Sequence, residues 1–241
     1  MLRILLWRLG FEFWDLVAVV VSRWPALEKF NPVRTYFAFG ANLSPAVLLR
    51  RQITPLHQED FLLQDHELLF NQPGPYEGFG FASVHARPGQ IVFGRLLQMR
   101  ALDEKRMDYF EVVPLLHRHR KITLTQAGQT FFFYQARYPK EGLRPTEEYL
   151  GKIMQAAEKS DIIPPDLLAS LRAIKPLETL EPATRNNFLV NNYEQGPTWM
   201  HPWWQRYDIW CRHFLMYCYE IQGLRRFIRV VEPEAPITSE A

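Results

Sequence analysis

Short apolar runs separated by Gly, Pro and polar turns predict several strands in the middle of the chain. The strand-like segments cover residues 35–39, 61–70, 80–86, 91–99, 118–125 and 130–136. The turn sequences NQPGPYEG, ARPGQ and QAGQ lie between several of them, and Gly and Pro in such clusters are typical of chain reversals. The pattern therefore predicts a sheet at the centre of the protein.

The predicted helices lie between some of these strands, without a strict alternation of strand and helix. Helices are predicted over residues 44–51, 100–111, 145–160 and 166–174, and Ser44 and Pro45 stand at the N-cap and first helical positions of the first helix. A few helices between many strands favour an α+β domain around a curled or closed sheet.

The N-terminal segment, MLRILLWRLGFEFWDLVAVVVSRW, is predicted to be a helix. Arg8, Glu12 and Asp15 interrupt its apolar run, which is shorter than the ~18 residues of a spanning helix, and no small-residue cleavage site follows. We expect the segment to be retained without crossing a membrane. Packing on the protein or a partner and peripheral membrane contact both remain open, since Trp and Arg side chains also suit a membrane interface.

The character of the chain changes after about residue 176. A Pro- and Asn-rich connection leads to the aromatic helix WWQRYDIWCRHFLMYCYEIQGLRRFIRVV, which is expected to end near Gly223, and EPEAPITSEA resembles a frayed tail. The aromatic face either packs against the N-terminal helix or forms an interaction surface. The predicted organisation is a helical extension over 1–33, a main domain over 34–176, and a linker, helix and tail over 177–241.

The composition favours a globular protein with a substantial core. The 241 residues are 47% hydrophobic, which supports a substantial core, and 28 basic against 26 acidic residues give a net charge of only +2. Because the charges are interspersed, no nucleic-acid partner is expected. Cys211 and Cys218 are poorly spaced for a disulfide, so we expect reduced thiols and a cytoplasmic location.

The stretch YFAFGANLSPAVLL, residues 36–49, is the first candidate site. A strand that ends at Gly40 and turns through Ala41 and Asn42 into a capped helix directs backbone N–H groups at one point, as anion and oxyanion sites do. The same residues also occur in ordinary turns. Further along, Gly78 and Gly80 lack the spacing of a nucleotide-binding loop and indicate a tight turn.

Glu111 is the leading candidate for acid–base chemistry. It stands among aromatic and aliphatic residues at a helix end, where desolvation is expected to raise its pKa towards that of a general base. Asp103 and Glu104 belong to a solvated face. His117 and His119 are interpreted as a solvated strand end, because no third metal ligand stands nearby.

In this order the segments resemble the gamma-glutamylcyclotransferase-like family over about residues 34–176. YFAFGANL resembles the family's YFAYGSNL signature, EGFGFASV its Gly-rich strand start, FGRLLQM the strand before its catalytic helix, and LDEKRMDYFEVVP the helix that ends in its carboxylate site. RPTEEYLGKIMQAAEKSDIIPPDLLASLRAI is similar to its C-terminal helical pair.

The resemblance implies a small mixed closed β-barrel with flanking helices and a reaction that needs no metal or organic cofactor. In that reaction the α-amine of a γ-glutamyl compound attacks its own γ-carbonyl, which gives 5-oxoproline and releases an amine or amino acid. Glu111 corresponds to the general acid/base. The implied substrate-binding residues are Tyr36, Phe37, Ala38, Phe39, Gly40, Ala41, Asn42, Gly78, Gly80 and Tyr149.

The sequence departs from the family pattern at three positions of the expected site. Phe39 and Ala41 replace a Tyr and a Ser, and Val112 replaces the Gly after the catalytic Glu. A site built from backbone donors tolerates the first two changes, whereas one that depends on hydroxyl groups does not. An inactive relative that acts as a binding or membrane-associated protein, a homodimer and the identity of the leaving group all remain open.

Overall fold

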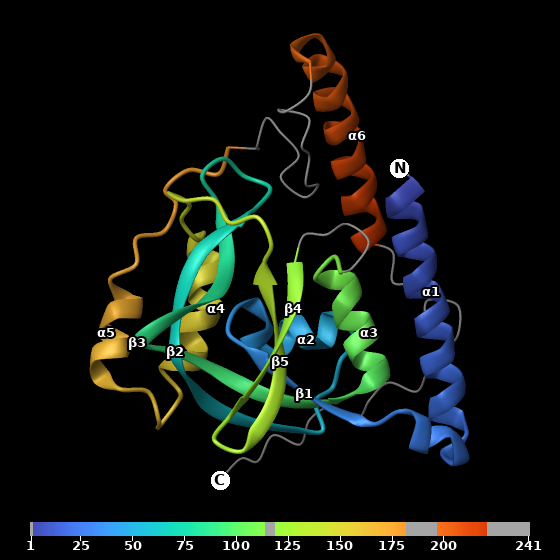
Figure 1. The fold of residues 1–241 in the computed structure, drawn as a ribbon, viewed down its shortest axis with the longest axis vertical. Coiled ribbons are helices and arrows are strands. Elements are labelled where there is room, and N and C mark those ends of the chain that lie inside the picture. Colours follow the sequence, from blue (N-terminus) through green and yellow to red (C-terminus); the bar gives the residue numbers. More distant parts are fainter. Residues whose placement is uncertain (1, 114–118, 182–196, 221–241) are drawn as a thin grey trace.

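The computed structural model describes residues 2–113, 119–181 and 197–220. Figure 1 shows the sheet at the centre, α4 and α5 at one side, and α3 and α1 at the other. The elements follow in the order α1 (Leu2–Arg23), η1 (Pro25–Phe30), β1 (Val33–Ala38), η2 (Ala41–Leu43), α2 (Pro45–Arg50), β2 (His57–Pro73), β3 (Gly80–Arg100), α3 (Ala101–Phe110), β4 (His119–Gln126), β5 (Gln129–Ala136), α4 (Glu147–Ala157), α5 (Pro165–Arg172), η4 (Thr198–Met200) and α6 (His201–Glu220).

The five strands form one sheet in the order β2-β3-β1-β5-β4. Three neighbouring pairs are antiparallel, and β1 pairs with β5 in parallel through Tyr36 and Phe132. The predicted α+β class is confirmed. The predicted closed barrel is wrong, because β2 and β4 are the edges of an open sheet.

Side chains link the edge strand β2 to the hairpin of β4 and β5, where a barrel would have a backbone ladder. The Gln64 backbone N–H of β2 donates to Gln126 Oε1 of β4 at 3.2 Å, and Gln129 Nε2 donates to Glu59 Oε1 at 2.8 Å. Glutamine and glutamate side chains thus occupy the seam.

One predicted turn lies inside a strand. The ARPGQ segment was expected to separate two strands, but β3 runs continuously from Gly80 to Arg100. The pairing with β2 shifts register between Gln64 and His66. Asp65 and Gly89 both have positive φ there, and the Gly89 N–H donates to Asp65 Oδ1 at 2.8 Å. The Gly and Pro signal therefore marks a bulge in a long hairpin.

The main core lies between the sheet and its covering helices. Aromatic side chains of β1 and β5 pack there, with Phe37, Phe131 and Phe133 almost completely buried. α4 closes one side through Tyr149 and Ile153. The Thr146 hydroxyl accepts a hydrogen bond from the Tyr149 N–H at 3.2 Å and caps this helix at its start.

A second cluster joins both terminal helices to α3. The Trp7 ring of α1 stacks on the Tyr109 ring with centroids 3.9 Å apart, and Trp7 Nε1 donates to the Tyr109 carbonyl at 3.1 Å. Arg8 Nη1 donates to the Tyr109 hydroxyl at 2.9 Å and to the Cys218 carbonyl of α6 at 3.0 Å. One face of α1 is therefore packed on its own protein.

The packing of α6 differs from the expectation for its aromatic residues. Cys211, Leu215 and Cys218 are its buried side chains in this cluster, and both cysteines are free thiols, as expected. Phe214 is partly buried against the same cluster, whereas other aromatic side chains of α6 face solvent. Burial against α1 is therefore wrong for four aromatic residues, which are exposed: Trp203, Tyr207, Trp210 and Tyr217.

Among the described residues, no helix combines the length and the apolar character that crossing a membrane requires. The predicted helix end near Gly223, the tail after it and most of the Asn-rich connection lie outside the described residues.

Candidate active site

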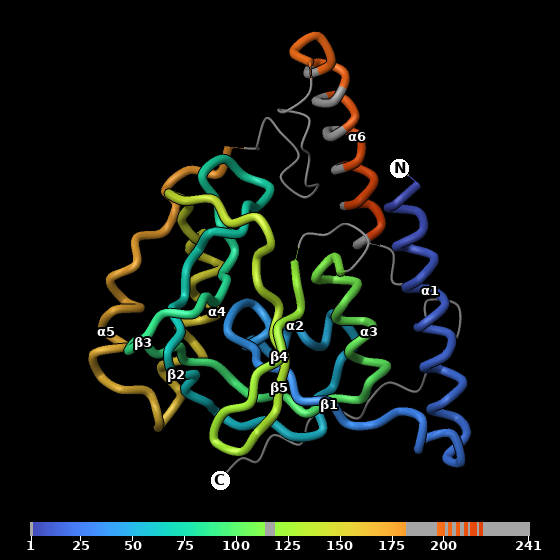
Figure 2. The backbone as a smooth tube through the Cα atoms, viewed as in Figure 1, coloured from blue at the N-terminus to red at the C-terminus, as the bar shows by residue number. Residues whose placement is uncertain are grey.

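The turn after β1 brings the backbone of Gly40 to the side chain of Tyr149. The Leu43 N–H donates to the Gly40 carbonyl at 3.0 Å and the Ser44 N–H to the Ala41 carbonyl at 3.1 Å, which folds the corner tightly. A Cβ at Gly40 would lie 2.6 Å from the Tyr149 hydroxyl. Glycine is therefore required here for close approach. Figure 2 traces this path from β1 into α2 at the middle of the molecule.

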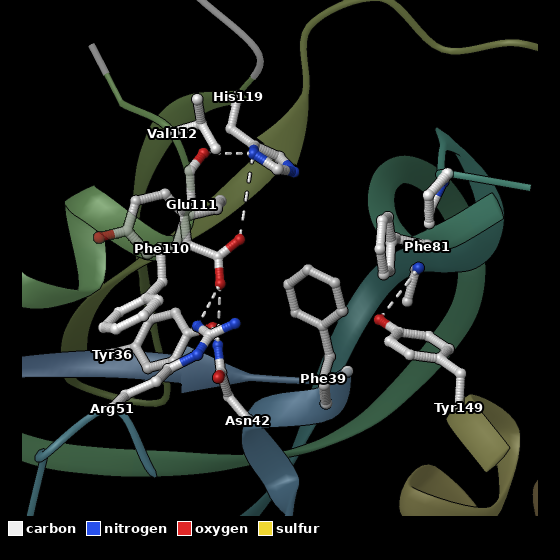
Figure 3. A pocket seen from close by; sticks show the side chains of 15 residues that line it. Tyr36, Phe39, Asn42, Arg51, Phe81, Phe110, Glu111, Val112, His119 and Tyr149 are labelled. Carbon is white, nitrogen blue, oxygen red and sulfur yellow. Dashed lines mark hydrogen bonds and ion pairs between the residues drawn. The ribbon is translucent and has the colours of Figure 1, made fainter. Parts of the chain in front are cut away.

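A cavity of about 280 Å³ opens beside this corner. Figure 3 shows the Glu111 carboxylate between His119 and the pair Arg51 and Asn42, with Phe39 and Tyr149 across the cavity. The described lining residues are Tyr36, Phe39, Gly40, Ala41, Asn42, Arg51, Pro75, Phe81, Ala82, Phe110, Glu111, Val112, His119, Tyr134 and Tyr149.

Glu111 follows the last residue of α3, and three side chains hold its carboxylate. Glu111 Oε1 accepts from Arg51 Nη1 at 2.7 Å and from Asn42 Nδ2 at 3.2 Å. His119 Nδ1 lies 3.9 Å from Glu111 Oε2 and 2.6 Å from the Glu111 backbone oxygen. These three side chains come from the corner after β1, from the end of α2 and from β4, and together they fix the position of the carboxylate.

The ionisation of Glu111 differs from the expectation. Burial raises the pKa of Glu111, but the charge of Arg51, the charge of His119 and the hydrogen bonds from Arg51 and Asn42 together hold it below its ordinary value. The prediction of a raised pKa is therefore wrong, because it considered desolvation without the cation that the fold supplies. Glu111 is a carboxylate at neutral pH.

Three buried phenols surround the cavity and remain protonated. Burial is the leading reason that the pKa values of Tyr36 and Tyr134 are raised and that the pKa of Tyr149 rises to about 12. The Tyr36 hydroxyl accepts from Asn42 Nδ2 at 2.8 Å, and the Tyr149 hydroxyl accepts from the Ala82 N–H at 3.2 Å. These groups can position a ligand by hydrogen bonding, whereas Glu111 can accept a proton.

The fold brings together seven of the eleven residues expected in the site. They are Tyr36, Phe39, Gly40, Ala41, Asn42, Glu111 and Tyr149. Phe37 and Ala38 are fully buried in the core instead, with Phe37 packed against the β5 aromatics. Alternation along β1 turns Phe37 away from the face that carries Tyr36, whereas Ala38 shares the face of Tyr36 but is fully covered by the core.

Gly78 and Gly80 lie outside the described lining of the cavity. Gly78 has a φ of +70° in a turn, and a Cβ at Gly80 would lie 2.1 Å from the Phe70 carbonyl oxygen. These glycines therefore allow a turn and a close backbone approach in the hairpin. Their predicted contact with substrate is not supported.

Arg51, His119 and Tyr134 are charged or ionisable lining residues that were not expected in this site. Arg51 immediately follows a helix, and no local pattern connects it to a carboxylate 60 positions away. The interpretation of His119 as part of a solvated strand end is wrong, since its side chain is 11% exposed and faces Glu111. His117 lies outside the described residues. No cluster of three His, Cys, Asp or Glu side chains that could hold a metal occurs in the described ranges.

Val112 accommodates the conformation that a glycine would adopt after Glu111. Its φ is +59°, in the left-handed region that a β-branched residue rarely enters. The side chain is 1% exposed and packs in the cluster of Trp7, Tyr109 and Leu215. Packing by the terminal helices thus compensates for backbone strain at the residue beside the carboxylate.

Several solved structures resemble this chain, two of them over about two thirds of its length and nearly the whole of their own. One is a protein described as gamma-glutamyl cyclotransferase, with 22% identity and a TM-score of 0.52 over 68% of this chain and 97% of that one. The other is an uncharacterized protein from Homo sapiens, with 23% identity and a TM-score of 0.50 over 68% of this chain and 96% of that one.

Comparison of structures finds relatives of this chain, whereas comparison of sequences finds none. No protein-family model matches the sequence, and no curated protein matches it significantly. The shared features are the order and arrangement of the strands and helices, over nearly the full length of both solved structures. The chain therefore has the gamma-glutamyl cyclotransferase fold.

Proposed function

We propose that this protein cyclises a γ-glutamyl amide to 5-oxoproline and releases an amine or amino acid. The observation that carries the proposal is the position of Glu111, whose carboxylate shares one cavity with the Gly40–Asn42 corner and Tyr149. These residues come from three distant parts of the chain. Their convergence supplies a base, backbone donors and a neutral hydrogen-bonding group around a single small ligand.

The proton transfers of the reaction require one group that acts first as a base and then as an acid. The substrate's α-ammonium loses a proton to Glu111, and its nitrogen forms a bond to the γ-carbonyl carbon. The bond from that carbon to the leaving nitrogen then breaks. Two protons leave the attacking nitrogen in total and both end on the leaving nitrogen, carried by Glu111, which finishes as a carboxylate.

Besides proton transfer, the protein has to orient the substrate, because the nucleophile and the electrophile belong to the same molecule. Well-oriented intramolecular reactions have effective molarities of ~10⁵ M or more, so folding the glutamyl chain into the attack conformation supplies much of the acceleration. Backbone N–H groups of the corner would stabilise the oxyanion on the γ-carbon. This role does not depend on the side-chain hydroxyl that Ala41 lacks.

The ionisation of Glu111 supports a base that is ready at neutral pH. Its lowered pKa means that the carboxylate form is present before substrate binds. The α-ammonium of the substrate is a second cation for this carboxylate, beside Arg51. We therefore expect Glu111 to contribute to substrate binding as well as to proton transfer.

The test is release of 5-oxoproline by purified protein from γ-glutamyl dipeptides, γ-glutamyl amines and glutamyl-lysine isopeptides. Glu111→Gln should abolish product formation while the circular dichroism spectrum stays native. Glu104→Gln, on the same helix with its carboxylate paired to Lys121, is the matched control and should remain active. A panel that yields no product, or equal rates for the wild type and Glu111→Gln, would contradict the proposal.

A further inference from the structure

We propose that α1 binds the surface of an anionic membrane through the face of the helix that points away from the protein. This outer leucine face consists of residues that are 42–68% exposed: Leu2, Leu5, Leu6, Leu9, Phe13 and Leu16. The proposal concerns where the protein works and is independent of the proposed reaction.

The outer leucine face is a continuous stripe along one side of the helix. Its members recur at spacings of three and four residues, and they lie opposite the buried Ile4, Trp7 and Phe11. From Leu2 to Leu16 the stripe is about 21 Å long. An exposed apolar surface of this extent and regularity indicates a binding function.

The packing of α1 sets how it could meet a bilayer. Its inner face lies along α3, and Figure 1 shows α1 at the periphery of the molecule with α3 on its inner side. The helix axis is therefore held parallel to the protein surface. Such a helix can immerse its outer side in the headgroup region while remaining attached to its domain, as interfacial amphipathic helices do.

The charges of α1 favour an anionic surface. Its two acidic residues are neutralised within the protein, Glu12 by Arg8 and Asp15 by the buried Arg106. The exposed charged residues of the helix are Arg3, in the first turn, and Arg23, at its last residue. The exposed charged groups of α1 are thus basic and lie near the two ends of the helix.

The residues after α1 extend the same surface chemistry. Trp24 is 60% exposed and Phe30 is 69% exposed, and the exposed Lys29 lies between them in sequence, as does Glu28, whose carboxylate is paired with Arg100. Aromatic and basic side chains in combination are typical of the interface between lipid headgroups and acyl chains. Because the exposed charges of α1 are basic and therefore complement anionic headgroups, we commit to lipid as the occupant.

The experiment is flotation of the full chain with phosphatidylcholine vesicles, with and without phosphatidylglycerol. Wild-type protein should float with the anionic vesicles and less with the neutral ones. The double variant Leu9→Glu/Phe13→Glu should bind at least about tenfold more weakly, since two apolar side chains no longer leave water. Ile162→Glu changes an equally exposed aliphatic residue between α4 and α5 and should float like the wild type.

Charge reversal separates lipid binding from other apolar association. Arg3→Glu/Arg23→Glu should abolish the preference for anionic vesicles. Absence of flotation, or equal flotation of the wild type and Leu9→Glu/Phe13→Glu, would overturn the proposal. So would light scattering that shows a dimer which this double variant dissociates, without vesicle binding, because the face would then join two copies of the chain. Release of 5-oxoproline in solution should be unaffected by any of these variants, which keeps the two proposals separable.

Discussion

Glu111 owes its ionisation to residues that the fold delivers from other elements. Burial alone would favour the neutral acid, but Arg51 Nη1 lies 2.7 Å from Glu111 Oε1, and the cation prevails. A carboxylate in this setting has a lower intrinsic basicity than a desolvated, unpaired one. In return, it is charged over the whole physiological pH range and can attract an ammonium group.

Removing Arg51 should move the pH dependence of the reaction. In Arg51→Gln the desolvation of Glu111 persists while its main stabilising charge is lost, so its pKa rises. The acid limb of the kcat/KM profile should therefore shift to higher pH. Arg50→Gln, at the exposed neighbouring position, should leave the limb in place. An unchanged acid limb in Arg51→Gln would show that Glu111 is not the titrating group.

Val112 allows a direct measurement of the strain beside the carboxylate. Truncation to Ala or Gly removes its packing in either case, but Gly also relieves the left-handed backbone, which costs other residues roughly 1–2 kcal/mol. We expect Val112→Gly to be more stable than Val112→Ala by about 1 kcal/mol in urea unfolding. At Val47, buried within α2, the order should be reversed by a similar amount. The same order at both positions would exclude backbone strain at Val112.

At the scale of elements, α1 packs on α3 through apolar, aromatic and ionic contacts. It combines the Trp7–Tyr109 stack with an ion pair, in which Arg106 Nε lies 3.1 Å from Asp15 Oδ1. Both side chains of the pair are almost fully buried. The interface is therefore sensitive to the loss of either partner.

Breaking this ion pair should destabilise the protein strongly. Asp15→Asn leaves the Arg106 charge buried beside Asp103 alone, and we expect a loss of about 3 kcal/mol of unfolding free energy. Urea denaturation measures it. Glu158→Gln breaks the exposed pair with Arg172 and should cost less than about 1 kcal/mol. A cost of that small size for Asp15→Asn would mean that α1 is only loosely attached to α3.

The sequence predicted elements well where periodicity is local, and poorly where the outcome depends on pairing. The helices over α1 to α5 and the strands β1, β4 and β5 agree with their patterns within a few residues. The closure of the sheet is a property of two edges far apart in sequence, which no local pattern encodes. The same limit applies to Gly89, since a glycine with positive φ serves a turn and a bulge equally well.

The sequence predicted several residues of the site, but it did not predict the basic side chains that surround the Glu111 carboxylate. The motif resemblance located Glu111, the Gly40–Asn42 corner and Tyr149, which the fold then brings into one cavity. Arg51 and His119 were not predicted as site residues, because they approach Glu111 only in the folded structure and no sequence motif connects them to it. Phe37 was included because the quoted motif covers both faces of a strand, whereas its side chain packs in the core.

At the scale of the whole molecule, the ionised Glu111 should make stability depend on pH. Its pKa in the folded state is below the ordinary value of 4.5, so its stabilising effect is complete above that value and is lost as pH falls through the folded-state pKa. The unfolding free energy of the wild type should therefore decline relative to Glu111→Gln on acidification below 4.5. Parallel urea titrations of both proteins measure this, and a constant difference would contradict the lowered pKa.

Val112 also has a bearing on how such a chain can change over evolutionary time. A glycine at this position would need no neighbours to stabilise its backbone, whereas Val112 depends on side chains from both terminal helices. The loop that carries Glu111 consequently depends on the packing of both ends of the chain. A deletion near the N-terminus would endanger the candidate site as surely as a substitution within it, unless residue 112 were also changed to glycine.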